Sequence, residues 1–198
     1  MDSDIFLAVN RFADRTPWAH GFFTAFTTYG VVVFALLLVV VFLDGRRTAD
    51  PHMVAASIWA GASALVAVGI GQIIGGAMGR SRPYNALSGV HLLVDRTTDF
   101  SFPSDHATAV GAVAVGLLFA HRRWGLVACV LAVLMGFSRV YVGAHYPTDV
   151  VGGLALGAVV AVAGRAMVVP ALVRLADRVE QSRWRFLVVG GSRDLTAG

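Results

Sequence analysis

Three short polar stretches interrupt an otherwise apolar chain, and each lies at the end of a long apolar run. The first is GRSRP at 79–83 and the second is PSDH at 103–106. The third begins with Ser138 and Arg139 and continues to His145 and Asp149. Together they supply arginines, histidines, an aspartate and a serine, which are the residue types that hold a phosphoryl group and transfer it through a histidine.

The third stretch has the spacing of a nucleophile and its orienting partner. His145 and Asp149 are four residues apart, so they can meet across one helical turn that starts near Pro147. An aspartate that accepts from one ring nitrogen sets the tautomer and leaves the other nitrogen free to attack. This stretch alone is equally compatible with a structural ion pair between Arg139 and Asp149 near the membrane interface.

The second stretch lies where a helix is expected to begin. Ser104 suits the capping position, and the free backbone amides of a helix start bind anions. His106 follows within the first turn, where it can donate a proton to a leaving oxygen. Taken alone, Pro-Ser-Asp is more commonly a plain helix start, and Arg82 in the first stretch would be an interfacial anchor.

The composition defines the environment in which these stretches must act. Of 198 residues, 57% are hydrophobic and only 14% are charged, against about 25% in soluble domains. This predicts an integral membrane protein. The net charge is +4, but all 16 basic residues are arginines at the ends of apolar segments, which favours membrane topology over a nucleic-acid partner. The single Cys129 lies in an apolar run and reads as a buried, inert thiol.

Apolar runs near the length of a bilayer span predict an all-α integral membrane bundle of about five spans. A span needs about 20 apolar residues. A tight turn is expected at 121–123. The predicted spans are residues 20–43, 53–78, 104–120, 124–142 and 147–169.

Two amphipathic segments flank the predicted spans. Residues 4–14 form a short helix that either lies in the membrane interface or packs on the bundle. Pro170 is expected to break or kink the fifth span, and a surface helix follows it. We therefore divide the chain into a membrane-embedded domain at 1–170 and a basic tail at 171–198.

The distribution of arginines predicts the topology. Five spans alternate sides, so the loop after the first span, the turn after the third and the tail share one face, which carries most of the arginines. A basic excess marks the cytoplasmic side. The C-terminus is therefore expected in the cytoplasm, and all three polar stretches face outward, as one composite site requires.

The order of the three stretches resembles the signature of the type 2 phosphatidic acid phosphatase superfamily over about residues 75–149. The signature is Arg-Pro, then Pro-Ser-x-His, then Ser-Arg with a histidine six residues on and an aspartate four beyond. The resemblance implies a helical bundle whose chemistry needs no metal or other cofactor. It implies that His145 is the nucleophile and forms a phosphohistidine, and that Asp149 orients it. His106 would protonate the leaving group and then activate water.

The resemblance also assigns phosphate binding to Arg82, Ser104 and Arg139. The family pattern carries a lysine where this chain has Gly75. We expect Arg80 to supply the missing phosphate contact, with Gln72 as a weaker candidate.

Asp105 is a second departure, because glycine is the commoner residue at its position. We group it with the phosphate-binding residues, and we expect its charge to favour the protonated form of His106, which suits a general acid.

An outward-facing site at membrane depth suits a lipid phosphate or diphosphate. The N-terminal helix with Ile5, Phe6 and Asn10, the variant PSDH and the compact length resemble the undecaprenyl-diphosphate phosphatases of the bacitracin-resistance type. That resemblance implies hydrolysis of the polyprenyl diphosphate carrier to its monophosphate for reuse in cell-wall synthesis, in a bacterial plasma membrane. A phosphatidylglycerophosphate or phosphatidic acid phosphatase is the alternative within the superfamily.

Two other classes of function share some of these features. Histidine, aspartate and arginine in a membrane bundle also suit a transporter with a proton relay. However, the ionisable groups lie at one face and no inverted repeat is visible. A metal site built on His106, His145 and Asp149 is a third possibility, although a metal hydrolase needs more carboxylates or histidines.

Overall fold

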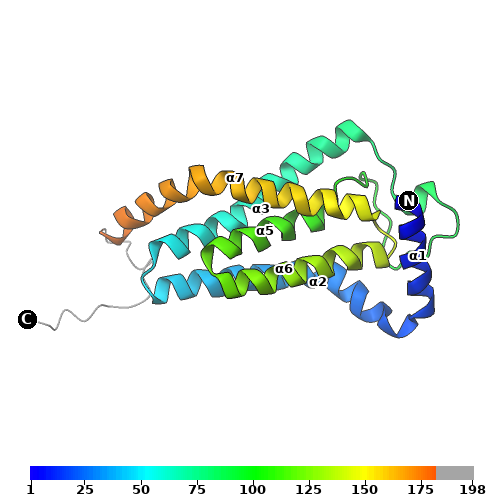
Figure 1. Ribbon diagram of the computed structural model, residues 1–198, viewed down its shortest axis with the longest axis horizontal. Helices are drawn as coiled ribbons and strands as arrows, with labels where there is room; N and C mark the ends of the chain where they lie inside the picture. Colours follow the sequence, from blue (N-terminus) through cyan, green and yellow to red (C-terminus); the bar gives the residue numbers. More distant parts are fainter. Residues whose placement is uncertain (182–198) are drawn as a thin grey trace, which may run out of the picture.

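Long apolar helices run side by side in the computed structural model, which describes residues 1–181 (Figure 1). The helices occupy most of this range, as the sequence predicts. They are α1 (Asp2–Arg15), the short 3-10 helix η1 (Pro17–Ala19), α2 (His20–Arg47), α3 (Pro51–Met78), α4 (Pro83–Ala86), α5 (Asp105–Ala120), α6 (Arg122–Tyr141) and α7 (Pro147–Glu180).

Local signals set the ends of the helices that lead into the polar stretches. Asp50 caps α3 by accepting a hydrogen bond from the backbone amide of Met53 at 3.0 Å. At the other end of α3, Gly79 adopts a left-handed conformation with φ of 61°, which a glycine takes without steric cost. This turn releases the chain toward Arg80. Pro147 stands in the first turn of α7, where its missing amide costs nothing.

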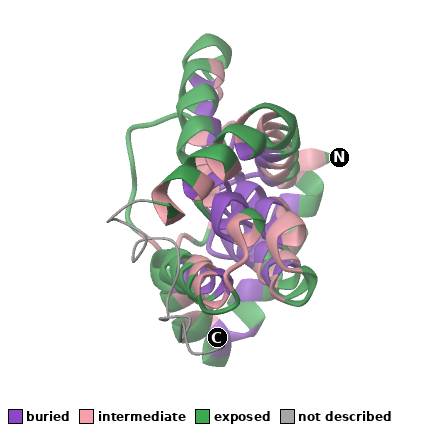
Figure 2. Cartoon of the chain, turned by 90° about the vertical axis from the view of Figure 1, so that its left-hand side faces the viewer, coloured by how far each residue is buried: buried purple, intermediate pink, exposed green. Residues whose placement is uncertain are grey.

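Four helical stretches within residues 1–181 are long and apolar enough to cross a membrane. They contain α2, α3, α6 and α7, and the shorter α5 is also apolar. α5 packs against all four of these helices. Figure 2 shows buried residues gathered in the middle of the bundle and exposed residues around it. Many exposed residues are large and apolar, as a lipid-facing surface requires. The predicted integral membrane bundle is confirmed.

Glycines let the central helix approach its neighbours closely. A Cβ atom on Gly157 of α7 would lie 2.2 Å from the backbone oxygen of Thr108 on α5. A Cβ atom on Gly116 of α5 would lie 2.5 Å from the Cβ atom of Ala60 on α3. Backbone contact of this kind is typical of helix packing in membranes, where van der Waals contact replaces the hydrophobic drive. It holds the start of α5 against the start of α7.

Helix α7 differs from the prediction. It continues through Pro170 to Glu180, so the fifth span is not broken there and the predicted surface helix is its extension. A proline removes one backbone donor, and membrane helices tolerate that loss. The predicted turn at 121–123 is shorter than expected, because α6 already begins at Arg122. The rest of the basic tail, including Arg183, Arg185 and Arg193, lies outside the described residues.

Helix α1 lies across one end of the bundle (Figure 1). It packs on α6 and α7 and buries Phe6, Asn10 and Ala13. The Asn10 amide makes two hydrogen bonds to the backbone of His91, each 2.8 Å long. The N-terminal helix is therefore docked on the bundle, at the end where the three polar stretches lie.

Candidate active site

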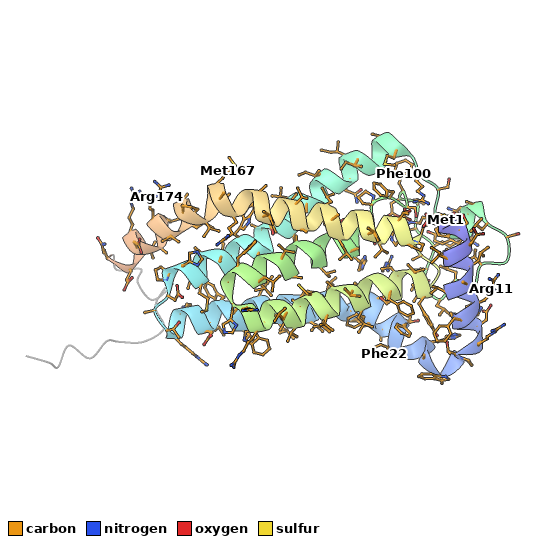
Figure 3. All side chains as sticks on the ribbon, in the orientation of Figure 1. Met1, Arg11, Phe22, Phe100, Met167 and Arg174 are labelled. Atoms are coloured by element: carbon orange, nitrogen blue, oxygen red, sulfur yellow. The ribbon has the colours of Figure 1, made fainter. Side chains whose placement is uncertain are left out.

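The fold brings the three polar stretches together at one end of the bundle. The Ser104 amide donates to the backbone oxygen of Asp149 at 3.1 Å, which joins the start of α5 to the start of α7. The Ser101 amide donates to the backbone oxygen of Arg80 at 2.8 Å, which joins the loop after α3 to the loop before α5. Figure 3 marks this end of the molecule by Met1 and Phe100.

His145 lies in the turn between α6 and α7 with its ring buried. Its Nδ1 atom is 2.8 Å from the backbone oxygen of Ser101. A carbonyl oxygen can only accept, so Nδ1 carries the proton and Nε2 keeps its lone pair. Burial lowers the pKa of His145 to about 4, so the ring is neutral at pH 7. The Nη1 atom of Arg82 lies 3.1 Å from Nε2 and donates to it. A neutral histidine ring with an unprotonated Nε2 is the form that a nucleophile requires.

Asp149 lies beside His145 but reaches it through a third residue. The distance from Nδ1 of His145 to Oδ2 of Asp149 is 3.8 Å, which is too long for a hydrogen bond. Instead, the Ser101 hydroxyl donates to Oδ2 of Asp149 at 2.6 Å, while the Ser101 carbonyl accepts from His145. Asp149 also accepts from the Tyr146 amide at 2.9 Å. The predicted proximity across one turn is present, and Ser101 is the bridge.

Sequence reasoning did not single out Ser101. It lies in a polar loop without periodicity, and its only signal is its place three residues before Ser104. The structure buries it completely. Its amide, hydroxyl and carbonyl each hold a different part of the site.

Two guanidinium groups and one hydroxyl in the site are buried and have donors that suit an anion. Arg82 and Arg139 are 5% and 9% exposed. Arg82 pairs with Asp99 at 2.8 Å, whereas Arg139 donates to the hydroxyl of Thr27 at 3.2 Å. Within residues 1–181, the Nε atom of Arg139 and the Oγ atom of Ser104 are buried without a hydrogen-bond partner. Such groups cost about 1–3 kcal/mol each, and the oxygens of a bound phosphate would offset that cost.

The alternative ion pair between Arg139 and Asp149 is not present. The carboxylate of Asp149 pairs with Arg80 at 2.6 Å. Arg80 also contacts Asp2 at 2.5 Å and the Thr148 hydroxyl at 2.7 Å. These contacts join Arg80 to Asp2 in α1 and to Thr148 and Asp149 in α7.

The first turn of α5 contributes His106 and Asp105. His106 lies within electrostatic range of His145, Arg82 and Arg139. The carboxylate of Asp105 accepts a hydrogen bond from the amide of Gln72 on α3 at 2.6 Å. Ser104 precedes them at the helix start, but its hydroxyl makes no capping bond, so it stays free for a ligand.

The position of the family lysine is closed by the backbone. A Cβ atom on Gly75 would lie 2.9 Å from the backbone oxygen of Phe102, which is closer than real Cβ contacts. A longer side chain there would displace the loop that leads to Ser104. In residues 1–181, no group of three or more His, Cys, Asp or Glu side chains is placed to hold a metal ion.

Fold and site together define a membrane-embedded helical bundle with a buried histidine and two buried arginines at one end. The chain belongs to the PAP2 superfamily, whose pattern residues 56–171 match. The predicted superfamily is thus confirmed.

Two named relatives and a solved structure resemble most of the chain. It is 31% identical over 160 residues to the undecaprenyl-diphosphatase BcrC of Bacillus subtilis (strain 168), covering 81% of this chain and 80% of that protein. It is 32% identical over 158 residues to the putative undecaprenyl-diphosphatase YbjG of Escherichia coli (strain K12), covering 79% and 77%. The crystal structure of Aquifex aeolicus LpxE superposes with a TM-score of 0.63 at 26% identity, covering 82% of this chain and 93% of that one.

Proposed function

We propose that this protein hydrolyses undecaprenyl diphosphate to undecaprenyl phosphate in a bacterial plasma membrane, which returns the carrier lipid to cell-wall synthesis. Membership of the PAP2 superfamily and relatives named as lipid phosphatases support a membrane lipid phosphatase. The two named relatives that cover most of the chain support the polyprenyl diphosphate as substrate. The observation that carries the chemistry is the neutral, buried His145 ring, whose Nε2 is unprotonated and accepts a hydrogen bond from Arg82.

The reaction proceeds in two displacements. Nε2 of His145 attacks the terminal phosphorus, the bond to the bridging oxygen breaks, and His106 donates a proton to that leaving oxygen. In the phosphohistidine, Nδ1 keeps its proton and still donates it to the Ser101 carbonyl. The nearby charge of Asp149 stabilises the cationic ring. His106 then takes a proton from water, which attacks phosphorus and releases inorganic phosphate and free His145.

The phosphoryl oxygens are held by Arg82, Arg139 and the Ser104 hydroxyl. Charge spreads over these oxygens in a loose transition state, so fixed donors in a dry site stabilise it strongly. The burial of both arginines and the unpartnered donors of Arg139 and Ser104 support this assignment.

The test is phosphate release by purified protein in detergent, with undecaprenyl diphosphate, phosphatidic acid and phosphatidylglycerophosphate compared at equal surface fraction. We expect the diphosphate to be hydrolysed fastest, undiminished activity in EDTA, and no activity in His145→Ala. Preference for a glycerophospholipid would overturn the carrier-lipid assignment and leave the chemistry intact. Full activity in His145→Ala would overturn the chemistry.

The proposed orientation places the site outside and the end of α7 in the cytoplasm, as the arginine distribution predicts. Single cysteines test it in a Cys129→Ala background. Ser88→Cys lies in the loop after α4, and Thr48→Cys follows α2 at the opposite end of the bundle; both positions are exposed. In intact cells, a membrane-impermeant maleimide should label the first and spare the second. The reverse pattern would invert the orientation.

A further inference from the structure

We propose that Arg80 is a positioning residue that clamps the first turn of α7 together with Asp2 of α1, and so holds Asp149 in register with His145. This inference rests on the proposed phosphohistidine chemistry. It differs from the expectation that Arg80 replaces the missing lysine as a phosphate ligand. The clamp consists of Arg80, Asp2, Thr148 and Asp149.

Arg80 is held from several sides at once. Its Nη1 atom donates to Oδ1 of Asp149 at 2.6 Å and to the Thr148 hydroxyl at 2.7 Å, while Nη2 donates to Oδ2 of Asp2 at 2.5 Å. The plane of the guanidinium lies over the ring of Tyr146 with its carbon 4.2 Å from the ring centre. A planar fork with several fixed donors suits two carboxylates at once, which the point charge of a lysine does not.

Asp2 caps α7 from a distant part of the chain. Its carboxylate accepts from the backbone amide of Thr148 at 3.1 Å and from the Thr148 hydroxyl at 2.6 Å. The amides of a first helical turn lack partners within their own helix, and a carboxylate there also matches the positive end of the helix dipole. Phe6 of α1, which is fully buried, packs on Tyr146 with ring centres 5.5 Å apart. α1 lies outside the residues that match the superfamily, 56–171.

The clamp matters because Asp149 is completely buried. Removing one partner of a buried ion pair leaves an uncompensated charge, which is strongly unfavourable. Arg80 is the arginine paired with Asp149 in the described part of the chain. Without it, the carboxylate relieves its charge by taking up a proton or by turning toward water. Either change alters its bond with Ser101, whose carbonyl orients His145. Loss of Arg80 should therefore misplace the nucleophile without removing a phosphate contact.

The test separates catalysis from phosphate binding by measuring kcat, KM and the inhibition constant of inorganic phosphate in purified Arg80→Gln, Arg80→Lys and Asp2→Asn. Inorganic phosphate occupies the anion site without a bond to His145. The substrate is whichever lipid phosphate the wild type hydrolyses. Arg80→Gln should lose about 10–100-fold in kcat, the range seen when a group that supports an active-site ligand is removed, while the inhibition constant of phosphate stays within about twofold. Arg80→Lys should retain part of the kcat that Arg80→Gln loses. Asp2→Asn should lower kcat less than Arg80→Gln does.

A double-mutant cycle with Asp149→Asn identifies the path of the effect. Because Arg80 acts through Asp149, adding Arg80→Gln to Asp149→Asn should lower kcat little further. Such non-additivity is typical of residues in one network. Arg96→Gln is the matched control, since Arg96 lies in the neighbouring loop between α4 and α5 and is exposed. Its contacts are a hydrogen bond to Asn85 at 3.4 Å and the ring of Tyr84, whose centre is 5.3 Å away. This variant should leave all three constants unchanged. Thermal midpoints confirm that each variant is folded.

Two results would overturn the clamp. A tenfold or greater rise in the phosphate inhibition constant of Arg80→Gln would make Arg80 a phosphate ligand, and unchanged constants in both Arg80 variants would leave it without a role. If Arg80→Gln does not fold, Arg80→Lys and Asp2→Asn carry the same comparison. Activity in His145→Ala would instead defeat the proposed chemistry, whatever Arg80 does.

Discussion

The two ends of the bundle use arginine in opposite ways. At one end Arg82 and Arg139 are buried, and the first lies against His145. At the other end Arg165 lies exposed over the ring of Phe119, 4.3 Å from its centre, and Arg174 donates to the Pro170 carbonyl of its own helix. Figure 3 shows Arg174 at the end of the molecule far from Met1 and Phe100. A buried guanidinium needs an anion, whereas an exposed one anchors a helix in the interface.

The largest expected difference between the two ends concerns histidine. His145→Ala removes the proposed nucleophile, and we expect a loss of at least about 10⁴-fold in kcat, together with loss of any trapped phosphoenzyme. His52→Ala removes an exposed histidine near the start of α3, at the other end, and should stay within about twofold. Similar losses in both variants would mean that the two ends do not differ in function.

Arginine gives the next largest contrast. Arg139→Gln should lower kcat by about 10²–10³-fold, because one fixed donor to the transition state is worth that much. Arg174→Gln should change kcat by less than about twofold. The measurement is initial phosphate release at saturating lipid in matched micelles. If Arg139→Gln were as active as Arg174→Gln, burial would not distinguish an arginine that binds an anion from one that anchors a helix in the interface.

The buried His145 also predicts how stability depends on pH. An unfolded histidine protonates near pH 6.5, but burial lowers the pKa of His145 to about 4. Between these values the unfolded state binds the extra proton, so stability is fully present above pH 6.5 and falls as the pH falls toward 4. The loss is about 3 kcal/mol. Thermal midpoints in detergent should fall less steeply with acid in His145→Gln than in wild type. Equal slopes would contradict the assignment.

The smallest effect concerns the seam between α5 and α7. Gly157→Ala places a methyl group against the α5 backbone, 2.2 Å from the Thr108 oxygen, and should destabilise the protein by about 1–3 kcal/mol. Gly69→Ala is the control, since its Cβ atom meets nothing within 4 Å and alanine favours a helix. We expect a lower thermal midpoint for the first and an unchanged or higher one for the second. Equal midpoints would show that the seam is not tightly packed.

Much of the fold and part of the site could be predicted from local sequence. Apolar run lengths locate the helices to within a few residues, because crossing a bilayer sets both composition and length. Of the two outcomes predicted at Pro170, the break is absent, since loss of one backbone donor is insufficient to end α7. Ser101 escaped notice, because its partners Asp149 and His145 lie 48 and 44 residues away. Local periodicity carries no information at that separation.

The sequence by itself determined that this chain is a membrane bundle of the PAP2 superfamily, and it predicted three polar stretches as the carriers of its chemistry. Segment hydropathy is a local property that suffices for the bundle, whereas the prediction of the site needed the order and spacing of all three stretches. Only the tertiary structure decided which charge meets which. It paired Arg80 with Asp149 and Asp105 with Gln72, placed Ser101 between Asp149 and His145, and left Arg139 with a free donor. Burial makes the pairings of Asp149 and Arg139 consequential, because a charge removed from water must find its partner within the fold.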